Sequence, residues 1–273
     1  MIDIILYDLD GAYCPPNLSA PVGGSEVELY QLHEAFNRAG IRCELITKRP
    51  DAFGGKLPIV ACKRLIYWRQ VEPAPWCDAD GECVRATDAK PDGYEEQRGL
   101  TTVCVSKWQA SAFKTPTMVI PPMLGPHVAL AAGSGTRWVS NIGWAYASAA
   151  NKGLAETLRA WRASEHYDRA PLYVTTTGYD EPEPGACEEH GAIWLGKLSP
   201  VSMVRMLSQV RGMFYRNVAP ETFGVTTAIA VKLGLELDIE CVGHEACGLA
   251  ESRVPQDLSE ATVVKRWMEV LGL

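Results

Sequence analysis

The sequence has no excess of basic residues. Of its 273 residues, 26 are Lys or Arg and 33 are Asp or Glu, which gives a net charge of −7 at pH 7. Bulk electrostatics would therefore not concentrate the protein on nucleic acid or on an anionic membrane. The main local exception is a basic stripe formed by Lys63, Arg64 and Arg69.

Long apolar runs are also missing, because no stretch reaches the roughly 18 residues that a membrane-spanning helix needs. The N-terminal residues 1–10 carry acidic side chains and no basic flank, so we expect a first strand there rather than a signal peptide. The nine cysteines form an odd set, and most lie inside apolar segments. This pattern is typical of a reduced, cytoplasmic protein.

No group of residues has the spacing of a known metal site. Cys77 and Cys83 bracket an acidic segment, but their spacing matches neither a zinc pair nor a calcium loop. Asp8 and Asp10 form a D-x-D triplet, which we expect to close the first strand. We therefore predict no metal.

A complete G-x-G-x-x-G fingerprint is lacking as well, which disfavours a nicotinamide-dependent oxidoreductase. Gly23 and Gly24 instead precede a predicted helix whose start has a capping box of Ser25 and Glu28. Two adjacent glycines allow a backbone to approach an anion or a sugar closely, although an ordinary loop fits them equally well.

What the chain does contain is an alternation of short apolar segments with amphipathic ones. This alternation predicts two successive βαβ runs, and therefore two parallel-sheet domains with a cleft between them. The small residues of 125–135 mark the boundary, with the N-terminal domain at 1–134 and the C-terminal domain at 135–273. Residues 72–99 and 180–189 are rich in proline and charge, so we expect loops there.

A strand that gives way to a helix in the second half is the strongest candidate for a ligand site. Residues 213–215 predict a buried strand, Pro220 a turn, and residues 224–233 a helix. Glu221 and Thr222 lie between them, where the amides at the start of a helix can bind an anion. An ordinary polar turn would have the same pattern.

Several fragments resemble, in their order along the chain, the retaining GT-B glycosyltransferases of the glycogen-synthase-like, family-four type. The resemblance extends over about residues 20–255. The matching fragments are Gly23–Glu26, Val105–Gln109, Val119–Pro122, Asn151–Leu154, Trp194–Gly196, Pro220–Gly224 and Cys247–Glu251.

This resemblance implies a GT-B-like α/β fold, in which two Rossmann-like parallel-sheet domains face each other across a cleft. It assigns the acceptor to the first domain and a nucleotide-diphosphate sugar, such as a UDP-sugar, to the second. It also implies transfer of the sugar with retention, with no catalytic metal and no cofactor. The acceptor remains open among a glycan, a small molecule and modified DNA.

The resemblance further implies roles for individual residues. Glu221 would accept hydrogen bonds from hydroxyls of the donor sugar, and Lys152 would meet the diphosphate, so these two are the candidate catalytic residues. The candidate residues for binding the donor and its diphosphate are Gly23, Gly24, Asn151, Thr222, Phe223, Gly224 and Val225.

Two positions depart from the family pattern. Ile229 stands where the family has a second Glu that holds the ribose, and no Arg follows Gly143. These departures keep a catalytically inactive GT-B-like binding module as an alternative. A further alternative is a transferase of the phage type that acts on modified bases in DNA.

Overall fold

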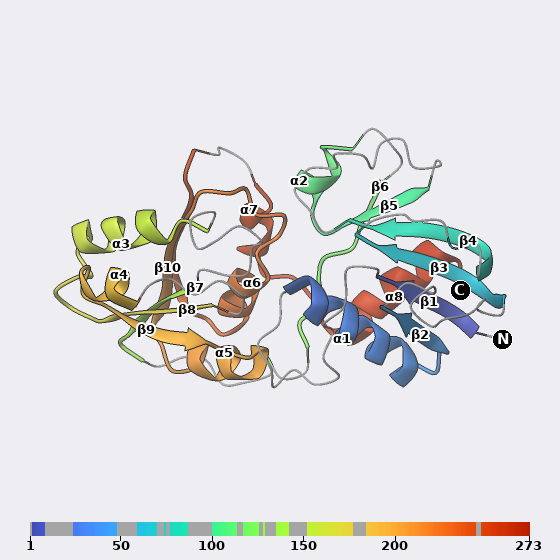
Figure 1. Cartoon of the computed structure of the whole chain (residues 1–273), viewed down its shortest axis with the longest axis horizontal. Helices are drawn as coiled ribbons and strands as arrows, with labels where there is room; N and C mark the ends of the chain where they lie inside the picture. Colours follow the sequence, from blue (N-terminus) through green and yellow to red (C-terminus); the bar gives the residue numbers. More distant parts are fainter. Residues whose placement is uncertain are drawn as a thin grey trace. The chain divides into compact units, whose positions relative to one another are not determined.

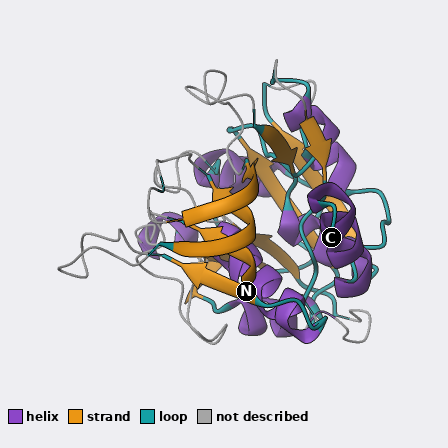
Figure 2. Ribbon diagram, turned by 90° about the vertical axis from the view of Figure 1, so that its right-hand side faces the viewer, coloured by secondary structure: helices purple, strands orange, loops and turns teal. Residues whose placement is uncertain are grey.

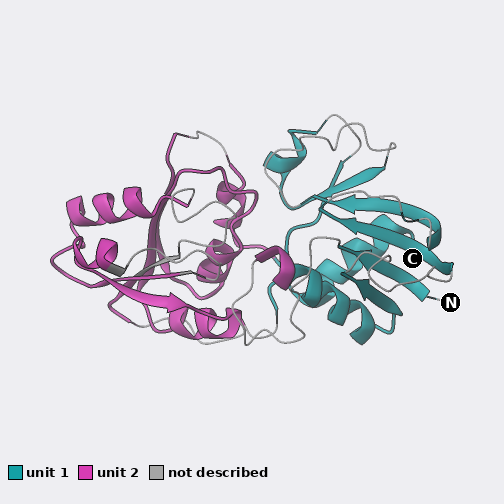
Figure 3. Cartoon of the chain, in the orientation of Figure 1, with its two compact units in different colours: residues 1–14, 28–125, 257–273 teal, residues 15–27, 126–256 magenta. Residues whose placement is uncertain are grey.

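The structure, a computed structural model, divides the chain into two compact units (Figure 3). Unit 1 comprises Met1–Cys14, Glu28–Gly125 and Asp257–Leu273, and unit 2 comprises Pro15–Val27 and Pro126–Gln256. The structure describes residues 2–8, 24–47, 59–69, 74, 77–86, 100–113, 117–125, 128, 135–141, 152–176, 184–243 and 247–273.

Unit 1 is built on a six-stranded parallel sheet with the strand order β2-β1-β3-β4-β5-β6 (Figures 1 and 2). Its elements are β1 (Ile2–Tyr7), α1 (Gly24–Arg38, which belongs to unit 1 from Glu28 onward), β2 (Cys43–Ile46), β3 (Val60–Trp68), β4 (Cys77–Arg85), β5 (Thr101–Cys104), α2 (Lys107–Ala110), β6 (Thr117–Val119) and α8 (Glu260–Leu271).

Both faces of this sheet are buried, which explains why β1 is apolar at nearly every position. Successive side chains of a strand point to opposite faces. Ile4 and Leu6 accordingly pack with α1 and α8. Ile5 and Tyr7 instead pack in a second cluster with side chains of β3 and β4.

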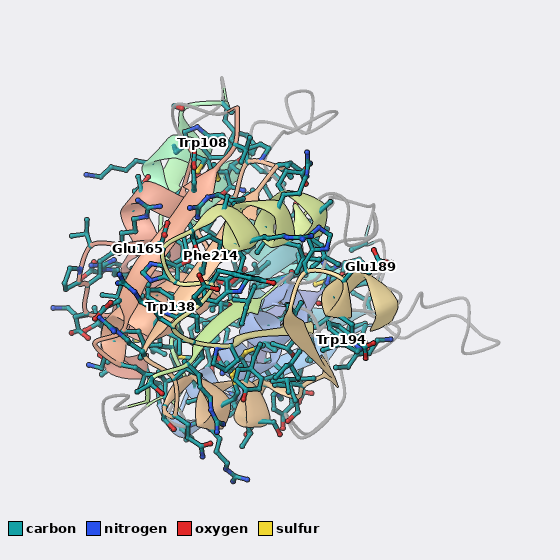
Figure 4. All side chains as sticks on the ribbon, turned by 90° about the vertical axis from the view of Figure 1, so that its left-hand side faces the viewer. Trp108, Trp138, Glu165, Glu189, Trp194 and Phe214 are labelled. Atoms are coloured by element: carbon teal, nitrogen blue, oxygen red, sulfur yellow. The ribbon has the colours of Figure 1, made fainter. Side chains whose placement is uncertain are left out.

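Unit 2 contains a five-stranded parallel sheet with the order β11-β10-β7-β8-β9. Trp138 and Phe214 come from the adjacent strands β7 and β10 (Figure 4). Both lie in one core with Trp161 of α3. The elements are β7 (Trp138–Asn141), α3 (Leu154–Ala163), β8 (Leu172–Thr176), α4 (Pro184–Glu188), β9 (Ala192–Lys197), α5 (Pro200–Leu207), β10 (Gly212–Asn217), α6 (Val225–Lys232), β11 (Glu236–Cys241) and α7 (Leu249–Ser252). The two parallel sheets confirm the predicted α/β class.

The last helix differs from the prediction, which grouped residues 257–273 with the second domain. In the structure α8 belongs to unit 1. Its buried side chains, Val263, Val264, Trp267 and Leu271, complete the core against α1 and the sheet. The chain leaves unit 1 after Gly125, whereas the prediction placed the boundary between residues 134 and 135.

Two segments predicted as loops contain regular structure. Within residues 72–99, Cys77–Arg85 forms β4, which pairs with both β3 and β5. Its acidic first half has low strand propensity, but pairing on both sides and burial of Cys83 and Val84 override that propensity. Within residues 180–189, helix α4 begins at Pro184, and proline is favourable at the first position of a helix.

The start of α1 also differs slightly from the prediction. The helix begins at Gly24, so Ser25 lies inside its first turn rather than at the cap position. Among the described helices, none has the length and hydropathy that crossing a membrane requires.

A buried ion pair joins the helices and strands of unit 1. The Arg85 guanidinium donates to the carbonyl oxygens of Cys104 (3.1 Å) and Ile120 (2.7 Å) and pairs with the Glu28 carboxylate of α1. It also lies 5.7 Å from the ring centroid of Trp267 in α8. Burial raises the pKa of Glu28, and the nearby Arg85 charge offsets part of that rise.

We expect Glu28→Gln to lower the free energy of unfolding by about 3 kcal/mol, because it leaves the buried Arg85 charge without a counter-ion. Denaturant unfolding followed by circular dichroism would measure this loss. The matched control is Glu260→Gln, which breaks a largely exposed pair with Arg38 and should cost about 0.5 kcal/mol. Equal losses in the two variants would contradict the prediction.

Candidate functional site

The turn between β10 and α6 lies at the carboxyl edge of the unit 2 sheet, where open α/β sheets bind ligands. Gly224 occupies the cap position of α6 with a φ of 79°, in the left-handed region. The backbone conformation favours glycine, and a Cβ atom there would in addition lie 2.8 Å from Cδ1 of Leu249. Gly224 has no side chain with which to cap α6, whereas Ser199 caps α5 by accepting from the amide of Ser202.

A second segment, Lys152-Gly153, is packed against the end of β10. Gly153 has a φ of 69°, and a Cβ atom on it would lie 1.8 Å from the carbonyl oxygen of Arg216. Just beyond, the Arg216 amide donates to the Thr157 hydroxyl of α3 at 2.9 Å. Only glycine permits this close approach, which fixes Lys152 at the end of the strand.

These two segments bring the predicted catalytic residues together. Nζ of Lys152 lies 2.5 Å from Oε1 of Glu221, and Nδ2 of Asn217 donates to the same oxygen at 2.9 Å. The side chains of Lys152 and Glu221 are 19% and 20% exposed, so both remain within reach of solvent. This Lys152–Glu221–Asn217 cluster is the candidate site.

Asn217 is a member of the cluster that the sequence analysis did not single out. It is the last residue of β10 and only 1% exposed. Its Oδ1 atom is buried and has no hydrogen-bond partner among the described residues. The sequence feature that points to Asn217 is a polar residue at the end of a mostly apolar strand, at the edge of the sheet where ligands bind.

A third segment supports the turn from the other side. The Gly248 amide, at the start of α7, donates to the Glu221 carbonyl oxygen at 2.8 Å. A Cβ atom on Gly248 would lie 1.7 Å from the carbonyl oxygen of Thr222. The turn that carries Glu221 is therefore held by backbone contacts on the Gly248 side as well as by Asn217 and Lys152.

The remaining predicted site residues have varied positions. Thr222, Phe223, Gly224 and Val225 follow Glu221 through the turn into α6, and Phe223 is buried, so only its backbone could meet a ligand. Gly24 begins α1. Gly23 and Asn151 lie outside the described residues, and so does the segment after Gly143.

Ile229 lies in α6 and is largely buried, so this position belongs to the apolar core. Over the part of the chain that the structure describes, no three His, Cys, Asp or Glu side chains lie close enough to hold a metal ion. The cluster thus offers one ammonium, one carboxylate and one amide beside the start of a helix.

Solved structures share this architecture. AviGT4, a glycosyltransferase involved in avilamycin A biosynthesis, matches with a TM-score of 0.67 and 12% identity over 100% of this chain and 97% of that one. WaaG, a glycosyltransferase involved in lipopolysaccharide biosynthesis, matches with a TM-score of 0.61 and 11% identity over 100% and 91%. HepE from Anabaena in complex with UDP-glucose matches with a TM-score of 0.58 and 12% identity over 100% and 91%.

These matches confirm the predicted GT-B fold, which this chain shares with glycosyltransferases. No protein-family model matches the sequence, and no curated protein matches it.

We expect Gly153→Ala to destabilise the protein by about 4 kcal/mol or more, because it adds a severe clash to a left-handed backbone conformation. The control is Gly196→Ala in the same unit, where φ is 76° and nothing lies within 4 Å of the new Cβ atom. Backbone strain alone should cost that variant about 1 kcal/mol. Thermal and urea unfolding would compare them, and similar losses would rule out the close approach to Arg216.

Proposed function

We propose that the protein is a glycosyltransferase that moves a sugar from a nucleotide-diphosphate sugar to an acceptor, with retention and without a catalytic metal. The observation that carries this proposal is the Lys152–Glu221–Asn217 cluster beside the start of α6. The GT-B fold supports it, since the structural neighbours named above are glycosyltransferases.

Lys152 would bind the diphosphate of the donor. Its ammonium has three donor positions, and the contact with Glu221 uses one of them. The positive end of the α6 dipole lies on the same side of the sheet as this cation. Together they would stabilise the negative charge that develops on the leaving diphosphate, which is the main electrostatic demand of such a transfer.

Glu221 would bind the donor sugar. Its Oε1 atom is held by two donors, whereas the hydrogen bonds within the described residues leave Oε2 available to accept from a sugar hydroxyl. Asn217 fixes the orientation of the carboxylate, because it is buried and holds Oε1 from the end of β10. HepE binds UDP-glucose, and we extend this to a UDP-sugar as the first donor to test.

The second candidate is a catalytically inactive module that binds a nucleotide or a sugar. The pairing of Lys152 with Glu221 favours it, because each of the two charges already has the other as its partner. The buried Ile229 also favours it, since this side chain offers no hydrogen bond to a ribose. This module would bind the ligand without turnover.

Incubation with a panel of UDP-, GDP-, ADP- and TDP-sugars, with release of the nucleotide as the readout, tests the proposal directly. We expect release from at least one donor when glycans and small molecules are offered as acceptors. A duplex carrying modified bases should give no salt-dependent gel shift, because the net charge of −7 opposes DNA binding. Binding without release would favour the inactive module, and the absence of both would exclude either function.

Two substitutions should separate the proposed roles. Lys152→Met should weaken binding of the nucleotide diphosphate about 30-fold, because it removes a charge-assisted hydrogen bond worth about 2 kcal/mol. Glu221→Gln should lower turnover about 100-fold with little change in the affinity for the free nucleotide. Calorimetry and initial rates would measure the two effects.

The control for Lys152→Met is Lys232→Met, which removes the same charge from the exposed last turn of α6. This variant should bind the nucleotide as the unmodified protein does. If Glu221→Gln retains full turnover, the assignment of Glu221 is wrong.

A further inference from the structure

Two cysteines lie close together behind the turn that carries Glu221. Cys241 ends β11, and Cys247 directly precedes Gly248 at the start of α7. A hydrogen bond joins their sulfur atoms at an Sγ–Sγ distance of 2.9 Å. The residues are 9% and 7% exposed, and both cysteines are free thiols.

We propose that Cys241 and Cys247 form a peroxide-reactive site, in which a hydroperoxide converts the two thiols into a reversible disulfide. The Cys247 thiolate attacks one oxygen of the peroxide, the O–O bond breaks, and hydroxide or alkoxide leaves, which yields a sulfenic acid. The Cys241 sulfur then attacks the Cys247 sulfur, the S–O bond breaks, and water leaves with the Cys241 proton. The peroxide is reduced and the two thiols are oxidised, so the electrons balance.

The environment of Cys247 suits the first step. The hydrogen bond to Cys241 lowers the pKa of Cys247 to about 6, and the backbone amide of Leu249 lowers it further, while burial opposes both effects. The same pairing raises the pKa of Cys241. Of the two thiols, Cys247 is therefore the one that loses its proton more readily, and the thiolate is the nucleophilic form.

A second thiol pair in the same chain provides an internal comparison. The sulfur atoms of Cys62 and Cys77, on the neighbouring strands β3 and β4, lie 3.4 Å apart. Burial raises the pKa of Cys62 to about 12 and also raises the pKa of Cys77. Burial disfavours the thiolate form of both members of this pair, so we expect the pair to react far more slowly than Cys247.

Formation of the disulfide would affect the candidate site through the backbone of Gly248. A disulfide has an S–S length of about 2.0 Å, so its formation draws the two sulfur atoms together. Gly248 follows Cys247, binds the Glu221 carbonyl oxygen and lies against the carbonyl of Thr222. We expect this movement to disturb the turn and to weaken nucleotide binding, a consequence that rests on the proposed function.

The test uses the intact protein, treated at pH 7 with a stoichiometric amount of hydrogen peroxide, then alkylated and digested with trypsin. Cys241 and Cys247 lie on one tryptic peptide, residues 233–253. We expect this peptide to lose the mass of two hydrogen atoms and to resist alkylation, and dithiothreitol should reverse both changes. Its oxidation should be at least about tenfold faster than that of Cys62 and Cys77.

Three variants sharpen the result. Cys241→Ser should leave a sulfenic acid on Cys247 that dimedone traps, whereas Cys247→Ser should abolish the reaction at this site. Cys62→Ser should leave the oxidation of residues 233–253 unchanged. Full alkylation of both cysteines after peroxide treatment, or earlier oxidation of Cys62 and Cys77, would overturn the proposal.

UDP binding to the reduced and oxidised forms tests the consequence separately. We expect about tenfold weaker binding after oxidation, restored by dithiothreitol. Equal affinities would overturn the link to the Glu221 turn. If the reduced protein binds no nucleotide, the proposed function fails in this test, while the mass change of the peptide still decides whether the disulfide forms.

Discussion

The candidate site depends on how closely the backbone at Gly153 approaches β10. A side chain at this position would overlap the carbonyl oxygen of Arg216. The approach carries the preceding residue, Lys152, to the end of the strand, where its ammonium meets Glu221. Gly248 permits a similar approach to the carbonyl of Thr222, and Gly224 adopts the left-handed conformation with which α6 begins. Three glycines thus determine where the charged groups of the site meet.

An ion pair that is partly buried gains little unless its geometry is fixed, because removing charges from water has a cost. Here Asn217 reduces that cost by adding a neutral donor to the same carboxylate oxygen. A ligand with a negative charge could take over the contact with Lys152 without leaving Glu221 unsupported. The cluster therefore allows Lys152 to exchange its contact with Glu221 for a contact with a bound anion.

Much of this arrangement could be predicted from the sequence, because it follows from local patterns. The apolar strand at 213–215, the turn at Pro220 and the following helix each have a local sequence signal, and the glycine after Lys152 lies in one of the fragments that resemble the family. The order along the chain of the fragments that resemble the glycosyltransferase family predicts the GT-B fold. The functional roles of Glu221 and Lys152 stay predictions.

The parts that could not be predicted depend on contacts between segments distant in the sequence. β4 has an acidic first half and is a strand only because β3 and β5 lie on either side of it. Asn217 reads as an ordinary end of a strand until the turn returns Glu221 to it. Helix α8 packs in the core of unit 1. Its amphipathic pattern shows that one face is buried, but not which of the two sheets that face packs against.

The return of α8 to unit 1 has a consequence for how the chain is made. Apart from residues 15–27, unit 2 is the single segment 126–256, whereas unit 1 requires residues 257–273 to close its core. During synthesis from the N-terminus, the apolar surface of the first sheet that packs against Trp267 stays uncovered until residues 257–273 have emerged. We therefore expect unit 2 to complete its fold first, although more than half of unit 1 precedes it in the sequence.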